Sequence, residues 1–325
     1  MPLVTTTVTA PGPGGPPVTP PFDPARDRQA LSVTYIDPDG QAWGWSDPAS
    51  NCRVTSVTGI GSAPASLSDT ALSGGGSLAQ SYSAAKRSIV VGLHVYDDVS
   101  QAGLLDLVDR LAYALWTERA GLPAPGRIMI ARPSGTSRQI EVYCTSGAEQ
   151  TDTDSTRDAY QRDTAYALTF ESGLDPMFQD VDPVGPLVFA APPSSGGVPP
   201  MPPVILAPPT TLGETTVTNA GNGEAYPIWE VHGPGTPTFT NVTTGREFSL
   251  AVTLGADEVI TIDTRPARQS AVDGTGADRW GDLVKTNPRD LWQLVPGANL
   301  LNLALAGSDT GSSISMLYYR RWLRA

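Results

Sequence analysis

Short runs in which apolar and polar residues alternate, separated by turn-forming residues, make up most of the chain. Residues 31–46 place one such run on each side of Asp37-Pro38-Asp39-Gly40, a sequence that favours a tight turn. A second pair of runs, RIMIARP and RQIEVYCT, lies on either side of Ser134-Gly135. The segment RSIVVGLHVY, residues 87–96, is rich in β-branched and aromatic residues. The first half of the chain is therefore predicted to contain two hairpins and a mostly buried strand.

One segment shows the period of a helix instead. From Leu104 to Trp116, apolar residues recur at steps of three and four, as in a helix that buries one face. Ser100 precedes this stretch and can cap it, while Gly121 and Pro123 follow and end it. We predict a single long α-helix at about residues 100–120.

The remainder of the chain separates into a connector and a second β-rich part. Ten prolines lie in residues 183–210, and proline lacks the backbone donor that a sheet interior needs. From Leu212 onward, short strand-like runs alternate with turn residues, which is typical of a β-sandwich. The first 26 residues are rich in Thr, Pro and Gly and predict a flexible arm.

The predicted fold is mainly β. It comprises an arm at 1–26, a β-sandwich-like domain with one α-helix at 27–182, a proline-rich linker at 183–210 and a β-sandwich at 211–325.

Composition restricts the function. The net charge is −12, and a negative chain is repelled by the phosphates of nucleic acid, so sequence-specific nucleic-acid binding is not expected. Apolar runs fall far short of the roughly 20 residues that cross a bilayer, so no membrane insertion is expected. The first residues lack the features of a secretory signal, which predicts folding in a cytoplasm. Cys52 and Cys144 share no close-spaced motif and are expected to be buried reduced thiols.

Candidate chemistry is sparse. His94 and His232 are the two histidines, and neither lies in a nucleophile motif, so no enzyme and no cofactor is predicted. Asp273 and Asp278 lie in a Gly-rich run that loosely suggests a calcium site, but the glutamate at the far end of a calcium loop is absent. A plain turn is the favoured interpretation of that run.

Aromatic and basic residues of the last part have two open interpretations. Trp280, Trp292 and Trp322 either stack on sugars or pack in a sandwich core, the more frequent use. Arg320 and Arg321 adjoin Trp322 in a local basic patch, which either contacts a neighbouring acidic subunit or is a solvated strand end.

Through the order of several segments, the sequence resembles distal tail proteins, which are minor tail proteins, of long-tailed phages (siphophages) with actinobacterial hosts. In the first part the resemblance lies in RSIVVGLHVYDD, the single helix and LTFESGLDPMF. In the second part the matching segments are TNAGNGEAYPIWEVHGPGTPTFTNVTTGREFSL, EVITIDTRP, VDGTGADRWGDL, LWQLVPGANLLNL and SMLYYRRWL.

The resemblance implies a structural role at the tail tip of a virion, with the protein made in the host cytoplasm. The first domain would form a homo-hexameric ring, and the second, galectin-like sandwich would project outward. The implied partners are the tail tube protein, a tail-tip hub or tail-associated protein, the tape measure protein and receptor-binding proteins. Two alternatives remain: a carbohydrate-binding module that contacts host cell-wall glycans, and a peptidoglycan-degrading enzyme with an unrecognised carboxylate pair.

Overall fold

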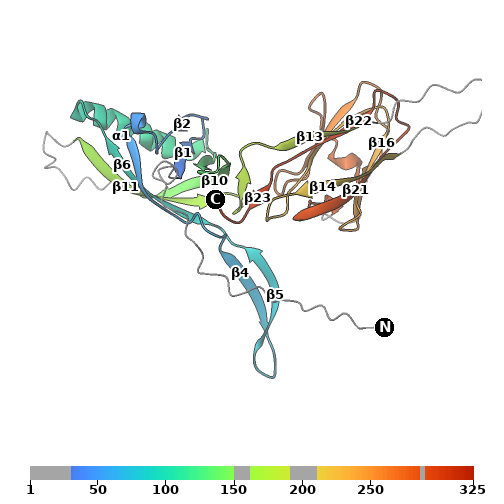
Figure 1. Ribbon diagram of the computed structural model, residues 1–325, viewed down its shortest axis with the longest axis horizontal. Helices are drawn as coiled ribbons and strands as arrows, with labels where there is room; N and C mark the ends of the chain where they lie inside the picture. The colour runs from blue at the N-terminus through green and yellow to red at the C-terminus, as the bar shows by residue number, and fades with distance from the viewer. Residues whose placement is uncertain (1–30, 150–161, 191–210, 286–289) are drawn as a thin grey trace, which may run out of the picture.

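The computed structural model describes residues 31–149, 162–190, 211–285 and 290–325. The predicted arm at 1–26 and residues 191–210 of the predicted linker lie outside these ranges. The described chain is mainly β and forms sandwich-like domains with one α-helix (Figure 1). None of the described helices has the length and apolar character needed to cross a membrane.

A nine-stranded antiparallel sheet organises the first domain, in the order β2-β1-β9-β10-β11-β6-β3, with β12 joining β10 to β23. The two predicted hairpins are present as β1–β2 and β9–β10, and Gly40 closes the first turn with a φ of 86°. The strands are β1 (Ser32–Ile36), β2 (Ala42–Trp43), β3 (Cys52–Thr58), β6 (Ser88–Tyr96), β9 (Gly126–Ala131), β10 (Ser137–Ser146), β11 (Asp163–Ser172), β12 (Phe178–Asp180) and β23 (Arg321–Trp322).

The predicted helix is α1 (Gln101–Leu115), which lies along one face of this sheet (Figure 1). Ser100 caps it, because its hydroxyl accepts a hydrogen bond from the backbone N–H of Gly103 at 2.9 Å. The helix is shorter than predicted, since residues 118–123 instead form the small hairpin of β7 (Glu118–Arg119) and β8 (Leu122–Pro123). Its core-facing residues are Leu104, Leu107, Leu111, Ala114 and Leu115.

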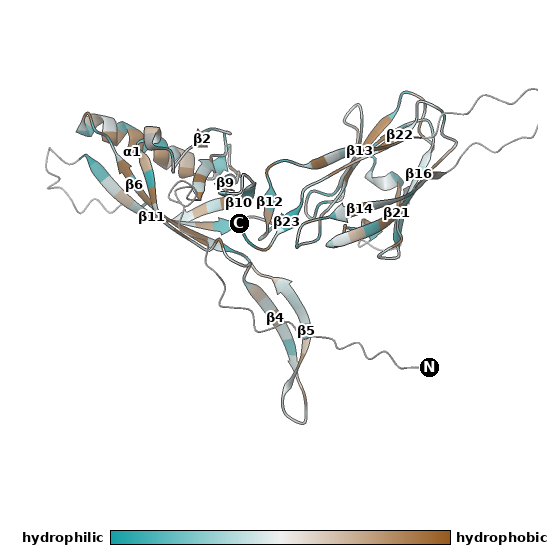
Figure 2. Ribbon diagram, viewed as in Figure 1, coloured by the Kyte–Doolittle hydropathy of each residue, from teal (hydrophilic) through white to brown (hydrophobic). Residues whose placement is uncertain are grey.

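Between helix and sheet lies the first hydrophobic core. Strand β6, predicted to be mostly buried, alternates instead, with Ile89, Val91, Leu93 and Val95 buried and the residues between them partly exposed. Tyr35 stacks on Trp45 with ring centroids 5.1 Å apart, and both rings contact Phe170. Hydrophobic and hydrophilic residues alternate in the same way along the strands of both domains (Figure 2).

Two five-stranded antiparallel sheets, β13-β22-β15-β18-β19 and β14-β21-β16-β17-β20, form the predicted second sandwich. Its core contains Trp229, Phe239, Phe248 and Trp292, all almost fully buried and in mutual ring contact. The strands are β13 (Val184–Ala190), β14 (Thr211–Asn219), β15 (Ile228–His232), β16 (Thr236–Asn241), β17 (Arg246–Leu250), β18 (Val259–Asp263), β19 (Ser270–Asp273), β20 (Leu283–Val284), β21 (Gly297–Ala306) and β22 (Ser313–Tyr318).

Strand β13 differs from the sequence expectation, because residues 184–190 lie in the stretch predicted to be a linker. The strand pairs with β22 through Leu187, Val188 and Phe189. Pro186 is accommodated because β13 is an edge strand and its register shifts between Val184 and Leu187. The first part of the proline-rich sequence, residues 184–190, is therefore a strand of the second sandwich.

A two-stranded hairpin, β4 (Ala65–Ala71) and β5 (Ser77–Ala84), projects from the first domain on the side away from α1 (Figure 1). The turn at residues 73–76 forms its tip, and every residue of both strands is exposed. At its base, Gly59 has a φ of 81°, and a Cβ there would lie 2.0 Å from the carbonyl oxygen of Ser88. Glycine is required at this position because the chain leaves the sheet directly against β6.

Arg87 follows the hairpin and is buried, with 1% of its surface exposed. Its guanidinium donates four hydrogen bonds, and all four acceptors are backbone carbonyl oxygens. They belong to Gly59 at 2.6 Å, Gly61 at 2.8 Å, Leu323 at 2.7 Å and Pro176 at 2.9 Å. The ring of Phe178 lies 4.9 Å from the guanidinium carbon. One side chain thus ties the base of the hairpin, the loop before β12 and the segment after β23.

Replacing Arg87 with methionine should lower the free energy of unfolding by about 3 kcal/mol, because a buried acceptor left without a partner costs about 1–3 kcal/mol. Urea unfolding followed by tryptophan fluorescence measures this loss. Arg127 on β9 is exposed, and Arg127→Met is the matched control, expected within about 0.5 kcal/mol of the unmodified chain. Equal unfolding midpoints for the two variants would show that the guanidinium does not hold these segments together.

Candidate functional site

The junction between the two domains is built by the segment Arg320–Ala325. This segment was predicted to belong to the second sandwich, but it returns to the first domain, where Trp322 pairs with Phe178 and Arg321 with Gln179. The backbone N–H of Ala325 donates to the carbonyl of Ile60 at 3.0 Å, and Ala325 is part of the first core. Residues more than 140 positions apart in sequence therefore share one sheet.

Charged contacts hold the junction. Arg321 makes a two-pronged contact with the carboxylate of Asp175, at 2.6 and 2.7 Å. The carboxylate of Asp180 accepts from Arg320 and from the indole N–H of Trp322, both at 2.6 Å. Bidentate arginine–carboxylate pairs combine strength with a fixed geometry.

These contacts place the basic patch against acidic residues of its own chain. The side chain of Arg320 remains 39% exposed and that of Arg321 13% exposed. Trp322 also lies beneath the guanidinium of Arg138, 3.9 Å from its carbon, so one face of the indole is covered. The patch is an internal clamp, and its acidic partners Asp175 and Asp180 could not be identified from sequence spacing.

A pocket of about 140 Å³ opens beside this clamp, with Leu174, Tyr226, Tyr319 and Arg321 among its walls. Two further arginines border it, and each has a carboxylate partner: Arg265 pairs with Asp263 and Arg268 with Glu141. Positive charge at this pocket is therefore balanced.

The two remaining tryptophan candidates differ in their burial. Trp292 is fully buried and donates its indole N–H to the carbonyl of Phe239 at 3.0 Å, so it is a core residue. Trp280 packs against the second core, and the ammonium of Lys285 lies 3.5 Å from its ring centroid.

The weak metal candidates serve turn closure. A carboxylate oxygen of Asp273 accepts hydrogen bonds from the backbone N–H and hydroxyl of Thr275 and from the N–H of Ala277. The Thr275 hydroxyl and these amides lower the pKa of Asp273. Asp278 accepts from the N–H of Trp280. Among the residues that the structure describes, no group of three or more His, Cys, Asp and Glu side chains is placed to hold a metal ion.

The histidines form surface pairs. His94 lies 2.9 Å from the carboxylate of Asp163, and His232 lies 2.7 Å from that of Glu230. The His94 pair joins neighbouring strands β6 and β11, and the His232 pair lies along β15 alone. These are ordinary pairs on the faces of sheets, consistent with the expectation that neither histidine is catalytic.

Both cysteines are free thiols in the described chain, Cys52 buried and Cys144 partly buried. Burial raises the pKa of each thiol to about 11. Since the thiolate is the reactive form, a shift of about two units makes roughly a hundredfold less of it available below the pKa.

In the folded protein at pH 8, Cys52 and Cys144 should therefore react with Ellman's reagent roughly a hundredfold more slowly than an unhindered cysteine. Both should react at the ordinary rate in guanidinium chloride. The reaction is followed by absorbance, and its rate in the folded state should still be rising with pH above 9. Fast labelling of either thiol at pH 8 would contradict the burial.

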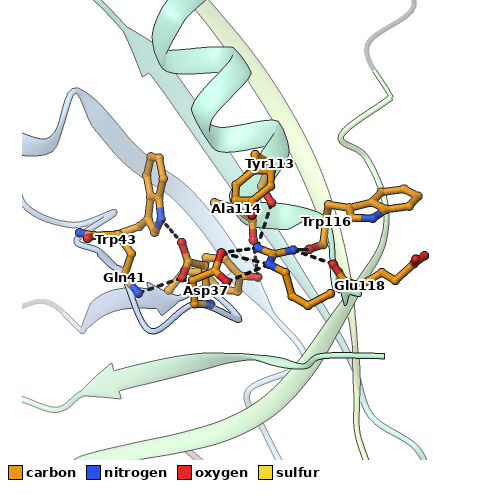
Figure 3. Close-up of polar contacts among 10 residues, drawn as sticks. Asp37, Gln41, Trp43, Tyr113, Ala114, Trp116 and Glu118 are labelled. Carbon is orange, nitrogen blue, oxygen red and sulfur yellow. Dashed lines mark hydrogen bonds and ion pairs between the residues drawn. The ribbon is translucent and has the colours of Figure 1, made fainter. Parts of the chain in front are cut away.

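A polar network fixes the end of α1 to the β1–β2 turn (Figure 3). Arg119 contacts both carboxylate oxygens of Asp39, at 2.8 and 3.0 Å, and its guanidinium lies 4.4 Å from the ring centroid of Tyr113. Tyr35 donates its hydroxyl to the carbonyl of Ala114 at 3.1 Å. The hydrogen bond from Arg119 lowers the pKa of Asp39. The surface around the end of the helix is thus held in place by several elements.

The projecting hairpin has two different faces. Leu67 lies opposite Tyr82 on one face, and the register shift between Ser68 and Asp69 places Leu78, opposite Thr70, on the other. The serines of the hairpin pair with one another on the other face, at Ser66–Ser83 and Ser68–Ser81. Leu67 and Leu78 are 60% exposed and Tyr82 is 77% exposed. A lone two-stranded hairpin is marginally stable in water, and several large apolar side chains exposed on it mark a contact surface.

A helix-bearing β domain joined to a second β-sandwich is a fold that also occurs among solved structures. The crystal structure of the SPP1 Dit protein, described as a paradigm of the hub adsorption apparatus in phages that infect Gram-positive bacteria, matches with a TM-score of 0.57. Sequence identity is 14%, and the match covers 90% of this chain and 99% of that one.

Two structures of the phage P2 baseplate in its activated conformation also match. The calcium form has a TM-score of 0.49 over 89% of this chain and 98% of that one, and the strontium form has 0.45 over 90% and 98%. Both share 10% identity with this chain. No protein-family model and no curated protein sequence matches. The resemblance to distal tail proteins is confirmed at the level of the fold, and the actinobacterial host stays a prediction.

Proposed function

We propose that the chain is a structural, non-enzymatic protein of a phage tail tip, which assembles with copies of itself into a hexameric ring. Such a ring joins the tail tube protein to the tail-tip hub or tail-associated protein. The tape measure protein and receptor-binding proteins are its further neighbours. The full-length fold match to SPP1 Dit supports the location in the tail.

The single observation that carries self-assembly is the set of exposed apolar side chains on hairpin β4–β5. Among the described residues, Leu67 and Leu78 are 60% exposed and Tyr82 is 77% exposed on this projection. At about 25 cal/mol per Å², burying such side chains against another molecule yields several kcal/mol. A copy of the same chain is the partner that a ring supplies.

The carbohydrate-binding alternative has less support from the site. It depends on exposed aromatic faces, whereas Trp292 is in the core and Trp280 and Trp322 each have a cation over the ring. A structural role needs none of these faces to be free.

Light scattering of the full chain tests the proposal, with a mass about six times that of the monomer expected at micromolar concentration. Tyr82→Asp should weaken association at least tenfold, because a charge replaces an interface aromatic, and such hot spots contribute about 2 kcal/mol or more. Ser81→Asp adds the same charge to the neighbouring residue on the serine face and should leave assembly intact. A monomeric unmodified chain at all concentrations would contradict self-assembly.

A further inference from the structure

Two arginines without partners lie together where the turn between β9 and β10 meets the segment after β23. Arg132 and Arg324 line a pocket of about 240 Å³ with Leu31 and Ile60, and we call these four residues the arginine surface. Arg324 is exposed and Leu31 is 42% exposed, so the surface is open to solvent. In the part of the chain that the structure describes, neither guanidinium has a hydrogen bond or an ion pair.

A third arginine adds positive charge from the interior. Arg138 is 8% exposed, and its guanidinium donates to the carbonyl of Arg324 at 2.6 Å. Its buried Nε has no partner among the described residues. Burial lowers the pKa of Arg138, and repulsion from Arg132 and Arg324 lowers it further. The carboxylate of Asp180 opposes this repulsion, but it is already paired with Arg320, so positive charge is in excess.

An acidic protein surface fits this site better than a free anion does. The whole chain has a net charge of −12, so two copies repel each other on average unless surfaces of opposite charge meet. Arginine is enriched in protein interfaces, where its charge is combined with apolar contacts. A small anion would leave Leu31 and Ile60 uncovered, whereas a surface with acidic and apolar side chains covers both kinds of wall.

The chain itself carries such a surface at the start of α1. We define the acidic surface by five exposed residues, Asp98, Val99, Leu105, Asp106 and Asp109. Its three carboxylates have no ion pair with the described residues. Asp97 adds a fourth carboxylate, while Arg110 and Arg162 lie close by, so negative charge is in excess. Val99 is 82% exposed and Leu105 is 49% exposed, which gives this surface apolar contacts as well.

The two surfaces lie at opposite ends of the first sheet, so they cannot meet within one chain. Arg132 follows β9 at the end of the sheet where Ala131 pairs with Ser137 of β10. The acidic surface begins after β6, whose last residue, Tyr96, pairs with Asp163 of β11. From Ser137 along β10 and then β11 to Asp163, the path covers on the order of 40 Å at about 3.3 Å per residue. In Figure 1 the marked C-terminus lies beside β10, and α1 extends away from it.

We propose that the arginine surface of one copy binds the acidic surface of the next copy. Two different patches at opposite ends of a subunit give a head-to-tail interface, which repeats around a ring. Ile60 of the arginine surface lies at the base of hairpin β4–β5, so this contact adjoins the hairpin whose burial the proposed ring requires. The inference rests on that ring and adds the charged pairing that sets its direction.

Charge reversal on either side tests the pairing in the full chain. The double variant Arg132→Glu, Arg324→Glu places like charges in contact, and so does Asp106→Arg, Asp109→Arg. Because like charges that face each other across an interface are strongly unfavourable, each should weaken association by about tenfold or more in light scattering over a range of concentrations. A chain with all four substitutions restores opposite charges and should associate within about threefold of the unmodified chain.

A matched control separates this pairing from an effect of net charge. Arg53→Glu, Arg127→Glu makes the same change in net charge at two exposed arginines outside the arginine surface and should leave association unchanged. Thermal unfolding of every variant verifies the fold. The charge-reversed chains should retain it, because the side chains that they replace have no ion pairs with the described residues.

Carbodiimide coupling gives a readout that does not depend on a change in affinity. The reagent joins a carboxylate to a lysine amine, and Arg132→Lys, Arg324→Lys retains the positive charge while it supplies the amine. An intermolecular ladder should appear on a denaturing gel, with Asp106 or Asp109 identified as the coupled carboxylate by mass spectrometry. Competing amines are few, since the sequence contains two lysines, Lys86 and Lys285. Adding Asp106→Asn, Asp109→Asn should abolish the ladder.

The outcomes separate this contact from ring formation. Association that persists in either charge-reversed double variant, or that is not restored in the chain with all four substitutions, would overturn the pairing and leave the ring standing. A ladder that survives Asp106→Asn, Asp109→Asn would also overturn the pairing. An unmodified chain that is monomeric at every concentration would overturn the ring and this contact together.

Discussion

A buried guanidinium determines how the parts of this molecule are joined. Four carbonyl oxygens from three separate segments replace the water that would otherwise hydrate the guanidinium of Arg87. The carbonyl dipoles stabilise its positive charge in the interior. Only arginine offers enough donors in a fixed plane to reach all of them at once, whereas lysine has three donors at one point. The geometry of the hairpin base, of the loop before β12 and of the segment after β23 is set at this residue.

The segment Arg320–Ala325 is one of these parts and belongs to the first domain. No single boundary in the sequence therefore separates the two domains. A fragment ending near Asp182 would keep Arg87 but lose the Leu323 carbonyl, and Asp175 and Asp180 would lose their arginines. The first sheet would also lose β23 at the edge of β12. The second sandwich therefore completes the first domain in addition to packing its own core.

Local patterns predicted those features that depend on neighbours in sequence. The strand at β6, the turn at Gly40 and the cap at Ser100 were confirmed because each is set within a few residues. The β4–β5 hairpin was missed because its strands are rich in serine, a weak strand signal, and because an extra residue in β5 interrupts the alternation between Leu78 and Tyr82.

Features that depend on distant residues could not be predicted. Nothing local indicates that Trp322 pairs with Phe178, and proline content alone argued against β13. Among the tryptophans, the sequence could not separate Trp292, a core residue, from Trp280, which has a lysine over its ring. The candidate site likewise emerged only in three dimensions, since the acidic partners of Arg320 and Arg321 lie about 140 residues earlier in the chain.

The same rigid joints explain why exposed apolar surfaces can persist on this chain. A flexible apolar hairpin would collapse onto its own domain or pair at random, whereas β4–β5 leaves the sheet at Gly59 and Arg87, which fix its direction. The end of α1 is fixed separately by Arg119 and Asp39. The hairpin and the end of the helix are thus each held in position within the single chain.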